Sequence, residues 1–207
     1  MNRKRLLLIA FILVALAQLF VPYQMISEQA YFANTGNEFR FKVMNNHSGS
    51  FRRGNTGTSI QGRYIRLMFE EDKFKVTDQK AVDYTQPFYV LFSKDSLGFA
   101  KIQLVTNTKP EFSSDWVKAR GWTYPKDSSF LHLNYPFNNY YIEDLIDKNV
   151  ESKLSKKLND SLSVIFLKVK IKENEFIVND LMIDGVSFKD FVKMFLSKKK
   201  YWLSYPL

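Results

Sequence analysis

Two histidines, His47 and His132, and no cysteine are available in this chain for binding a metal or for nucleophilic catalysis. Zinc sites in proteins use His and Cys ligands at short and regular spacings, and these two histidines are far apart in the sequence. His132 lies between apolar neighbours, where a water-facing strand residue or a hydrogen-bonded core residue is expected. His47 lies in a polar segment, where a solvated side chain is expected. The sequence therefore predicts no metal site and no cofactor.

Acidic residues cluster at two places, without a pattern typical of acid–base catalysis. Glu143 and Asp144 are adjacent at the expected start of a helix, where carboxylates complement the helix dipole. Glu70, Glu71 and Asp72 follow an expected strand, and we interpret them as polar residues at a strand end before a turn. No Gly-x-Ser-x-Gly elbow and no glycine-rich phosphate loop occurs in the sequence. We therefore expect no catalytic residue and a protein that is not an enzyme.

Aromatic residues are the better candidates for recognition. Tyr140 and Tyr141 follow a Pro-Phe-Asn-Asn turn, and on the rim of a sheet they would form an amphipathic platform for a partner. Core packing with the hydroxyl groups pointing outward is the alternative for at least one of them. Trp116 and Trp122 flank a short basic stretch, where contacts between cations and rings can form. Tyr64 lies on the strand face opposite an apolar row and is expected to pack there or to line a groove.

Alternating apolar and polar residues predict that these side chains are carried by antiparallel strands. In residues 62–69, Ile65, Leu67 and Phe69 share the face that should lie in the core. A five-residue connection suggests one hairpin, and the Glu173-Asn174 pair suggests a second. The expected strands are residues 38–44, 62–69, 88–93, 99–105, 130–135, 161–172 and 175–184.

Two further internal segments stand out between the strands. Residues 45–61 are rich in Asn, Gly, Ser, Thr and Arg, and we expect a long loop, which in a compact domain is usually functional or mobile. Residues 143–158 carry apolar side chains at helical spacing, from Leu145 and Ile146 to Leu158, and predict one helix that packs against the sheets.

The last part of the chain, residues 186–207, predicts an amphipathic basic helix and a tail. Phe188, Phe191 and Phe195 recur at helical spacing opposite lysines, and Ser187 is a credible N-cap. One interpretation places this helix on an anionic lipid surface, with the later lysines, Tyr201 and Trp202 at its end. The other docks the Phe stripe on the β structure and leaves the lysines in water.

The chain begins with Arg3, Lys4 and Arg5, followed by a nearly unbroken apolar run. Residues 6–26 would span roughly 30 Å as a helix, which matches the hydrocarbon core of a bilayer. We therefore predict a signal anchor over residues 1–26, with the basic end in the cytoplasm and the rest of the chain on the other side. A signal peptide cleaved after Ala17 is the alternative.

The net charge of +9 is unevenly distributed. The first basic cluster holds three of these charges and the segment after Gly185 a net four, so the body of the chain is nearly balanced. Nucleic-acid binding depends on a contiguous basic surface, and we therefore expect no nucleic-acid partner.

Residues 62–69 resemble the signature of the GDYXXLXY family of bacterial membrane-anchored proteins. Gly62, Tyr64 and Leu67 match the signature, Phe69 stands for its last Tyr, and Arg63 replaces its Asp. Other segments are similar in order and spacing, so the resemblance covers residues 3–185: these are residues 39–41, 89–91, 136–141 and 181–185. The family has no settled activity, and its members accompany polytopic membrane proteins. The resemblance therefore implies an accessory role at a membrane, with no catalytic residues to transfer.

Together these observations predict a mainly β protein with α elements (α+β), built as two antiparallel sheets or a partly closed barrel of hairpin units. We expect an anchor at residues 1–26, an exported domain at residues 27–185, periplasmic in a bacterium, and the basic helix at residues 186–207. The expected function is a non-enzymatic interaction module or accessory subunit of an integral membrane protein, with Gly62, Tyr64, Leu67, Phe69, Tyr140 and Tyr141 as candidate interaction residues. The alternative is an envelope protein that binds a lipid or glycan at the rim formed by residues 45–61, Tyr140 and Tyr141.

Overall fold

The computed structural model describes residues 37–44, 51–52, 63–76, 83, 85–124, 127–142 and 148–202, with scattered positions between residues 11 and 36. The chain forms two compact units, Met1–Gly36 and Asn37–Leu207. Most of the predicted anchor at residues 1–26 lies outside the described residues, although the positions described between Phe11 and Ser27 are helical. Within the described part of the chain, no helix is both long enough and apolar enough to span a bilayer, so the predicted transmembrane helix has no support there.

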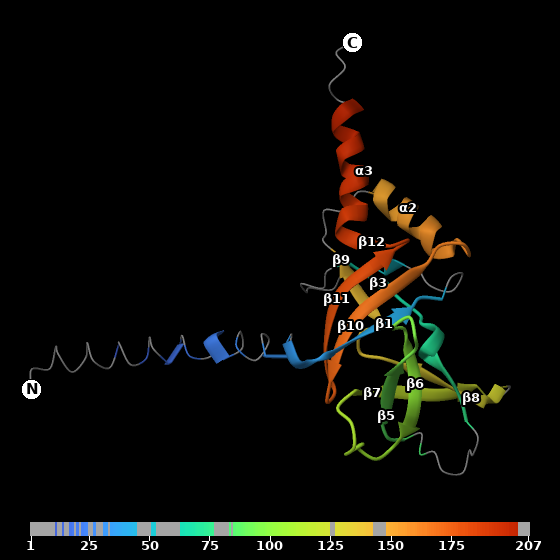
Figure 1. Ribbon diagram of the computed structural model, residues 1–207. Helices are drawn as coiled ribbons and strands as arrows, with labels where there is room; N and C mark the ends of the chain where they lie inside the picture. Colours follow the sequence, from blue (N-terminus) through green and yellow to red (C-terminus); the bar gives the residue numbers. More distant parts are fainter. Residues whose placement is uncertain are drawn as a thin grey trace, which may run out of the picture. The chain divides into compact units, whose positions relative to one another are not determined.

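The second unit is mainly β and consists of three antiparallel sheets (Figure 1). This confirms the predicted mainly β fold with antiparallel sheets. Of the two predicted arrangements, two sheets was wrong, whereas a partly closed barrel agrees with the structure. In order across each sheet, the strands are β1 (Asn37–Lys42), β10 (Ile165–Lys172), β11 (Glu175–Ile183) and β12 (Val186–Ser187); β2 (Phe51–Arg52), β3 (Arg63–Arg66) and β9 (Asn139–Ile142); and β4 (Lys73–Lys75), β8 (Asp127–Asn134), β7 (Trp116–Tyr124), β5 (Phe88–Lys94) and β6 (Ala100–Thr106).

Backbone contacts join these sheets around one core. Val43 pairs with Phe69 beyond the end of β1, and the Leu67 amide donates to the Asn138 carbonyl, which extends the pairing of β3 with β9. These contacts place six strands in a nearly closed, barrel-like arrangement, in the order β12, β11, β10, β1, β3 and β9. A parallel bridge between Arg40 and Phe99 connects β1 to the five-stranded sheet.

Both predicted hairpins are present. The β10–β11 turn places Glu173 at φ 48° and Asn174 at φ 74°, as a two-residue hairpin turn of the primed type requires. In the β5–β6 hairpin, one oxygen of Asp95 accepts hydrogen bonds from the backbone amides of Leu97 and Phe99, at 2.9 and 2.8 Å. Local turn chemistry therefore sets the register of both pairs.

Two helices cover one end of this β structure. Helix α2 (Lys148–Asn159) buries Val150, Leu154 and Leu158, as the apolar spacing predicts; the first residues of the predicted helix, 143–147, lie outside the described residues. Helix α3 (Phe188–Trp202) buries Phe188 and Phe191 in the main core, which agrees with docking of the Phe stripe on the β structure.

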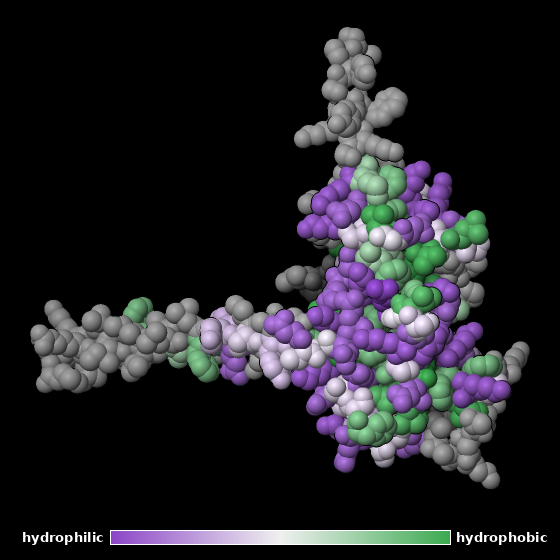
Figure 2. Space-filling model, viewed as in Figure 1, coloured by the Kyte–Doolittle hydropathy of each residue, from purple (hydrophilic) through white to green (hydrophobic). Residues whose placement is uncertain are grey.

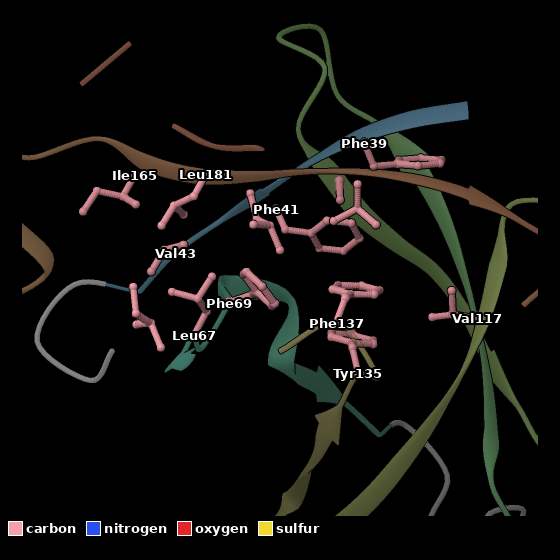
Figure 3. Close-up of a cluster of buried hydrophobic side chains, with 14 of the residues drawn as sticks. Phe39, Phe41, Val43, Leu67, Phe69, Val117, Tyr135, Phe137, Ile165 and Leu181 are labelled. Carbon is pink, nitrogen blue, oxygen red and sulfur yellow. The ribbon is translucent and has the colours of Figure 1, made fainter. Parts of the chain in front are cut away.

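The core is rich in phenylalanine, with Phe41 at its centre (Figure 3). The Phe41 ring lies 4.8 Å from Phe137, 5.0 Å from Phe92 and 5.5 Å from Phe69, measured between ring centroids. Tilted and edge-to-face pairs of this kind add about 0.5–1.5 kcal/mol each to the effect of burial. Outside this core, the face of the molecule in Figure 2 is mostly hydrophilic, with apolar residues in small groups.

Five strands were not expected from the sequence, namely β2, β4, β7, β9 and β12. Strand β7 contains Gly121, which usually weakens a strand. A Cβ at this position would lie 2.6 Å from a Phe88 ring carbon and 2.8 Å from a Leu131 methyl carbon, so the absence of a side chain allows the close approach. The predicted loop at residues 45–61 was also partly wrong, since Phe51 and Arg52 pair with Ile65 and Tyr64; the rest of this segment lies outside the described residues.

Candidate functional site

The residues of the signature divide between the core and the surface. Leu67 and Phe69 are fully buried, and Phe69 packs against Phe41 and Phe137, so both are structural residues. Tyr64 is half-buried on the outer side of β3. Gly62 lies outside the described residues, as does the side chain of Arg63.

Tyr64 and Tyr141 form a cross-strand aromatic pair on the outer surface. They lie opposite one another in the β3–β9 register, and their ring centroids are 5.9 Å apart. Tyr141 is 67% exposed, which is unusual for a large aromatic ring in a strand, but Tyr140 and Tyr141 do not share one platform, because successive residues of β9 point to opposite sides. The fold therefore brings together two candidate residues that lie far apart in the sequence.

Tyr140 points to the opposite side of β9, into the space between β9 and β11. Its ring lies edge-to-face with Phe188 at 5.3 Å, and its hydroxyl group forms a hydrogen bond with the Leu181 backbone. Burial and the nearby Asp180 carboxylate raise the Tyr140 pKa to about 12, so the hydroxyl stays protonated. Tyr140 therefore links β9 to β11 through its side chain where no backbone ladder connects the two strands.

A groove of about 510 Å³ lies at this gap in the barrel-like arrangement. One wall is β9, and the other walls come from β11, β12 and the first turns of α3. The groove is lined by Tyr140, Tyr141, Ile142, Asn179, Asp180, Ser187, Phe188, Lys189, Val192 and Lys193. It combines apolar side chains with tyrosine hydroxyl groups, one carboxylate and two lysines, and its volume lies within the range of small-molecule sites in proteins.

Helix α3 begins at the groove with an N-cap at Ser187. The Ser187 hydroxyl oxygen accepts a hydrogen bond from the Asp190 amide at 3.1 Å, as the predicted N-cap should. Lys189 and Lys193 are exposed on the same helix, and Lys193 forms an ion pair with Asp190 at 3.0 Å. The first turns of α3 therefore carry a small net positive charge, because Asp190 offsets one of the two lysines.

A second polar cluster was missed by the sequence analysis. Glu71 and Asp72 do lie at a turn, the short 3-10 helix η1 (Glu70–Asp72), but they are only 5% and 6% exposed rather than solvated. Glu71 forms an ion pair with Lys101 at 3.1 Å, and one Asp72 oxygen accepts the Phe69 amide at 2.8 Å. The other oxygen of each carboxylate has no hydrogen-bond partner within the described part of the chain.

Burial determines the protonation of this cluster. It raises the pKa of Glu71, against the opposing effect of the Lys101 hydrogen bond, and it raises the pKa of Asp72 to about 7. The buried Tyr135 hydroxyl donates to the Glu71 carbonyl at 2.7 Å, and burial holds its pKa well above the usual value. Because both carboxylates are almost fully buried and are held by Lys101 and the Phe69 amide, we interpret these groups as structural rather than catalytic.

The remaining candidates are placed as follows. His132 lies on β8 between two aromatic rings, Trp122 at 5.9 Å and Tyr124 at 4.7 Å, while His47 lies outside the described residues. Trp116 is buried and Trp122 is 38% exposed. In the described ranges, no group of three or more His, Cys, Asp or Glu side chains is arranged to hold a metal ion.

No protein-family model, curated protein or solved structure matches this chain. The resemblance to the GDYXXLXY family therefore stays a prediction from the sequence.

Proposed function

We propose that this chain is a non-enzymatic interaction module that is anchored in a membrane, acts outside the cytoplasm and serves as an accessory subunit of an integral membrane protein. We further propose that the groove between β9 and α3 receives an extended segment of that partner. The observation that carries this proposal is the unpaired edge of β9, which borders the groove opposite the part of β11 that β12 leaves uncovered, the residues before Met182.

The register shows which backbone groups of β9 point toward the groove. In an antiparallel pair, residues alternate between those that bond to the neighbouring strand and those whose amide and carbonyl groups point away from it. The Leu67–Asn138 hydrogen bond sets the phase, so Tyr140 bonds to β3 and the backbone groups of Tyr141 point to the free edge. The described residues supply no backbone partner for these groups of Tyr141.

An extended segment would complete this edge by strand addition, a common mode of peptide recognition. Its backbone would pair with β9, and its side chains would alternate between the apolar floor around Phe188 and the outer surface beside Tyr141. Since Lys189 and Lys193 line the α3 wall, a segment that carries a carboxylate on that side is favoured.

Binding of an envelope lipid or glycan is the second candidate function. The groove volume of about 510 Å³ and the mixture of apolar side chains with tyrosine hydroxyl groups are also suited to a small amphipathic ligand. A ligand of this kind would not need the backbone amide of Tyr141, and this difference separates the two candidates.

The test is site-specific photo-cross-linking of the full chain in its native membranes. A photoreactive amino acid replaces Asn179, which lines the groove and is exposed, and in a control it replaces Leu97, which is 68% exposed in the β5–β6 turn. We expect one integral membrane protein to be captured from position 179 and not from position 97. Capture of lipid alone, or the same products from both positions, would contradict the proposed partner.

Two variants at Tyr141 test strand addition. Tyr141→Ala and Tyr141→Pro both remove the ring, but only proline removes the amide that points to the free edge. We expect Tyr141→Pro to lower the yield of the adduct from position 179 at least several-fold below that of Tyr141→Ala. Circular dichroism of the purified variants controls for folding, and equal yields from two folded variants would exclude backbone pairing.

A further inference from the structure

A second exposed surface lies on the outer face of the five-stranded sheet. We define the basic aromatic face by Lys73, Lys118, Arg120, Trp122, Tyr124 and His132. Lys73 pairs with His132, and His132 pairs with Trp122, so β4, β8 and β7 present these side chains to the same side. The neighbouring positions Leu131 and Leu133 are buried on the opposite side, which packs on the core.

The centre of this face is an exposed group of rings. Trp122 stacks on His132 at 5.9 Å with 20° between the ring planes, and Tyr124 meets His132 edge-on at 4.7 Å. Trp122 is 38% exposed and Tyr124 is 51% exposed, although both lie in an ordered strand. These three rings have an apolar body and a polar edge, a composition typical of surfaces that lie at the headgroup level of a membrane.

Cations surround these rings. Lys73, Lys118 and Arg120 are exposed, and the Lys118 ammonium lies 5.4 Å from the centroid of the Tyr89 ring. In the strand register, one acidic residue, Asp127, is paired with Tyr124, so the three cations give this face of β4, β8 and β7 a net positive charge. The face is therefore complementary to a surface of negative charge, although the body of the chain is nearly balanced overall.

We propose that the basic aromatic face lies on an anionic membrane surface, with its cations among lipid phosphates and its rings at the headgroup level. The proposal relies on the membrane anchoring proposed above, because a tether keeps the domain at high effective concentration near the bilayer. Each Lys or Arg near an anionic surface strengthens the association about fivefold, and salt weakens this contribution. The face is distinct from the groove, which is lined by β9, β11, β12 and α3.

The absence of cysteine allows one fluorescent label to be placed at a single introduced thiol. Lys75→Cys places an environment-sensitive label beside the face, since Lys75 is exposed on β4 and pairs with Phe130. Lys153→Cys on α2 is the matched control, because Lys153 is also exposed and the substitution also removes one lysine. Both full-length chains are reconstituted in phosphatidylcholine vesicles with and without phosphatidylglycerol.

We expect a blue shift of the label at position 75 only in vesicles with phosphatidylglycerol, reversed by high salt, and no such shift at position 153. In the Lys75→Cys chain, adding Lys118→Glu and Arg120→Glu should lower the blue-shifted fraction about tenfold or more. The charge-matched pair Lys153→Glu and Lys156→Glu should leave it unchanged.

A label at position 75 that does not respond to anionic lipid would overturn the proposal, as would a response at position 153 instead. A response of position 75 to single-stranded oligonucleotide without a response to lipid would assign the face to nucleic acid and also overturn it. If the anchor does not hold the chain in a bilayer, the chain will be lost from neutral vesicles, and this outcome is distinct from the others. The label at position 75 then measures binding of the chain to anionic vesicles added from outside.

Discussion

At the scale of single residues, the most consequential groups are the buried carboxylates of η1. Glu71 and Asp72 are side by side in a nearly dry environment, and each keeps one oxygen without a partner among the described residues. Desolvation makes the charged form of both groups unfavourable in the folded state. The consequence is a dependence of stability on pH that the sequence pattern did not indicate.

The sign of this dependence follows from the Asp72 pKa, which rises from 3.8 to about 7 on folding. Between these values the folded state holds a proton that the unfolded state releases, so the free energy of unfolding falls as pH rises. The full effect is on the order of a few kcal/mol, and the stabilisation is complete below the unfolded pKa. Glu71, whose pKa is also raised, contributes with the same sign.

We predict that Asp72→Asn flattens this slope. Asparagine keeps an oxygen that can accept the Phe69 amide, but it does not titrate. The measurement is chemical denaturation of the full chain in detergent at several pH values between 4 and 8. Asp83→Asn is the control, because the hydrogen bonds of exposed Asp83 with Thr85 lower its pKa and place its titration below this range. An unchanged slope in Asp72→Asn would contradict the assignment.

At the scale of elements, the helix α3 depends on how it begins. The Ser187 cap satisfies the Asp190 amide, and Phe188 then turns inward to pack on Tyr140. A helix that lost this cap would still be held by Phe191 in the core, so the effect should be local. The first turn of α3 also forms one wall of the groove, which connects the cap to the proposed binding site.

We predict that Ser187→Ala destabilises the first turn of α3 by about 0.5–2 kcal/mol, the usual cost of removing an N-cap. The measurement is amide hydrogen exchange of the first two turns, with the helix α2 as the internal reference. Faster exchange in α3 with unchanged exchange in α2 is expected. Equal acceleration in both helices would show a global effect and would exclude a local capping role for Ser187.

At the scale of the whole molecule, placement depends on the basic triplet at residues 3–5 and the apolar run that follows it. If this segment anchors the chain as proposed, the carboxyl end lies outside the cytoplasm. We predict that alkaline phosphatase fused after Leu207 is active and that green fluorescent protein at the same site is dark. The reverse pattern would exclude the extracytoplasmic placement, and with it the proposed partner and membrane contact.

The distribution of charge in the folded protein differs from its distribution along the sequence. The sum over the body of the chain is nearly neutral, which argued against an extended basic surface. Pairing of β4, β8 and β7 nevertheless gathers Lys73, Lys118 and Arg120 on one side of a sheet. A patch is a property of the fold, because residues distant in sequence become neighbours only when the strands pair.

The sequence by itself determined the local parts of this protein. Alternation predicted β1, β3, β5, β6, β8, β10 and β11. Helical spacing predicted α2 and the inward face of α3, because these patterns express burial within a single element. The turn at Glu173-Asn174 was also predictable, since positive φ favours particular residues. Tyr140 and Tyr141 stay predicted interaction residues, and nothing local showed what lies opposite them.

Only the tertiary structure decided the unexpected strands, the burial of the carboxylates and the position of the groove. Strand β7 tolerates Gly121 because Phe88 and Leu131 fill the space where a side chain would be, and β9 is a strand because β3 offers it a ladder. Burial of Glu71 and Asp72, and the groove between β9 and α3, depend on contacts between segments far apart in the chain. Such contacts are set by the packing of the whole core, and the order of residues within one segment carries no direct record of them.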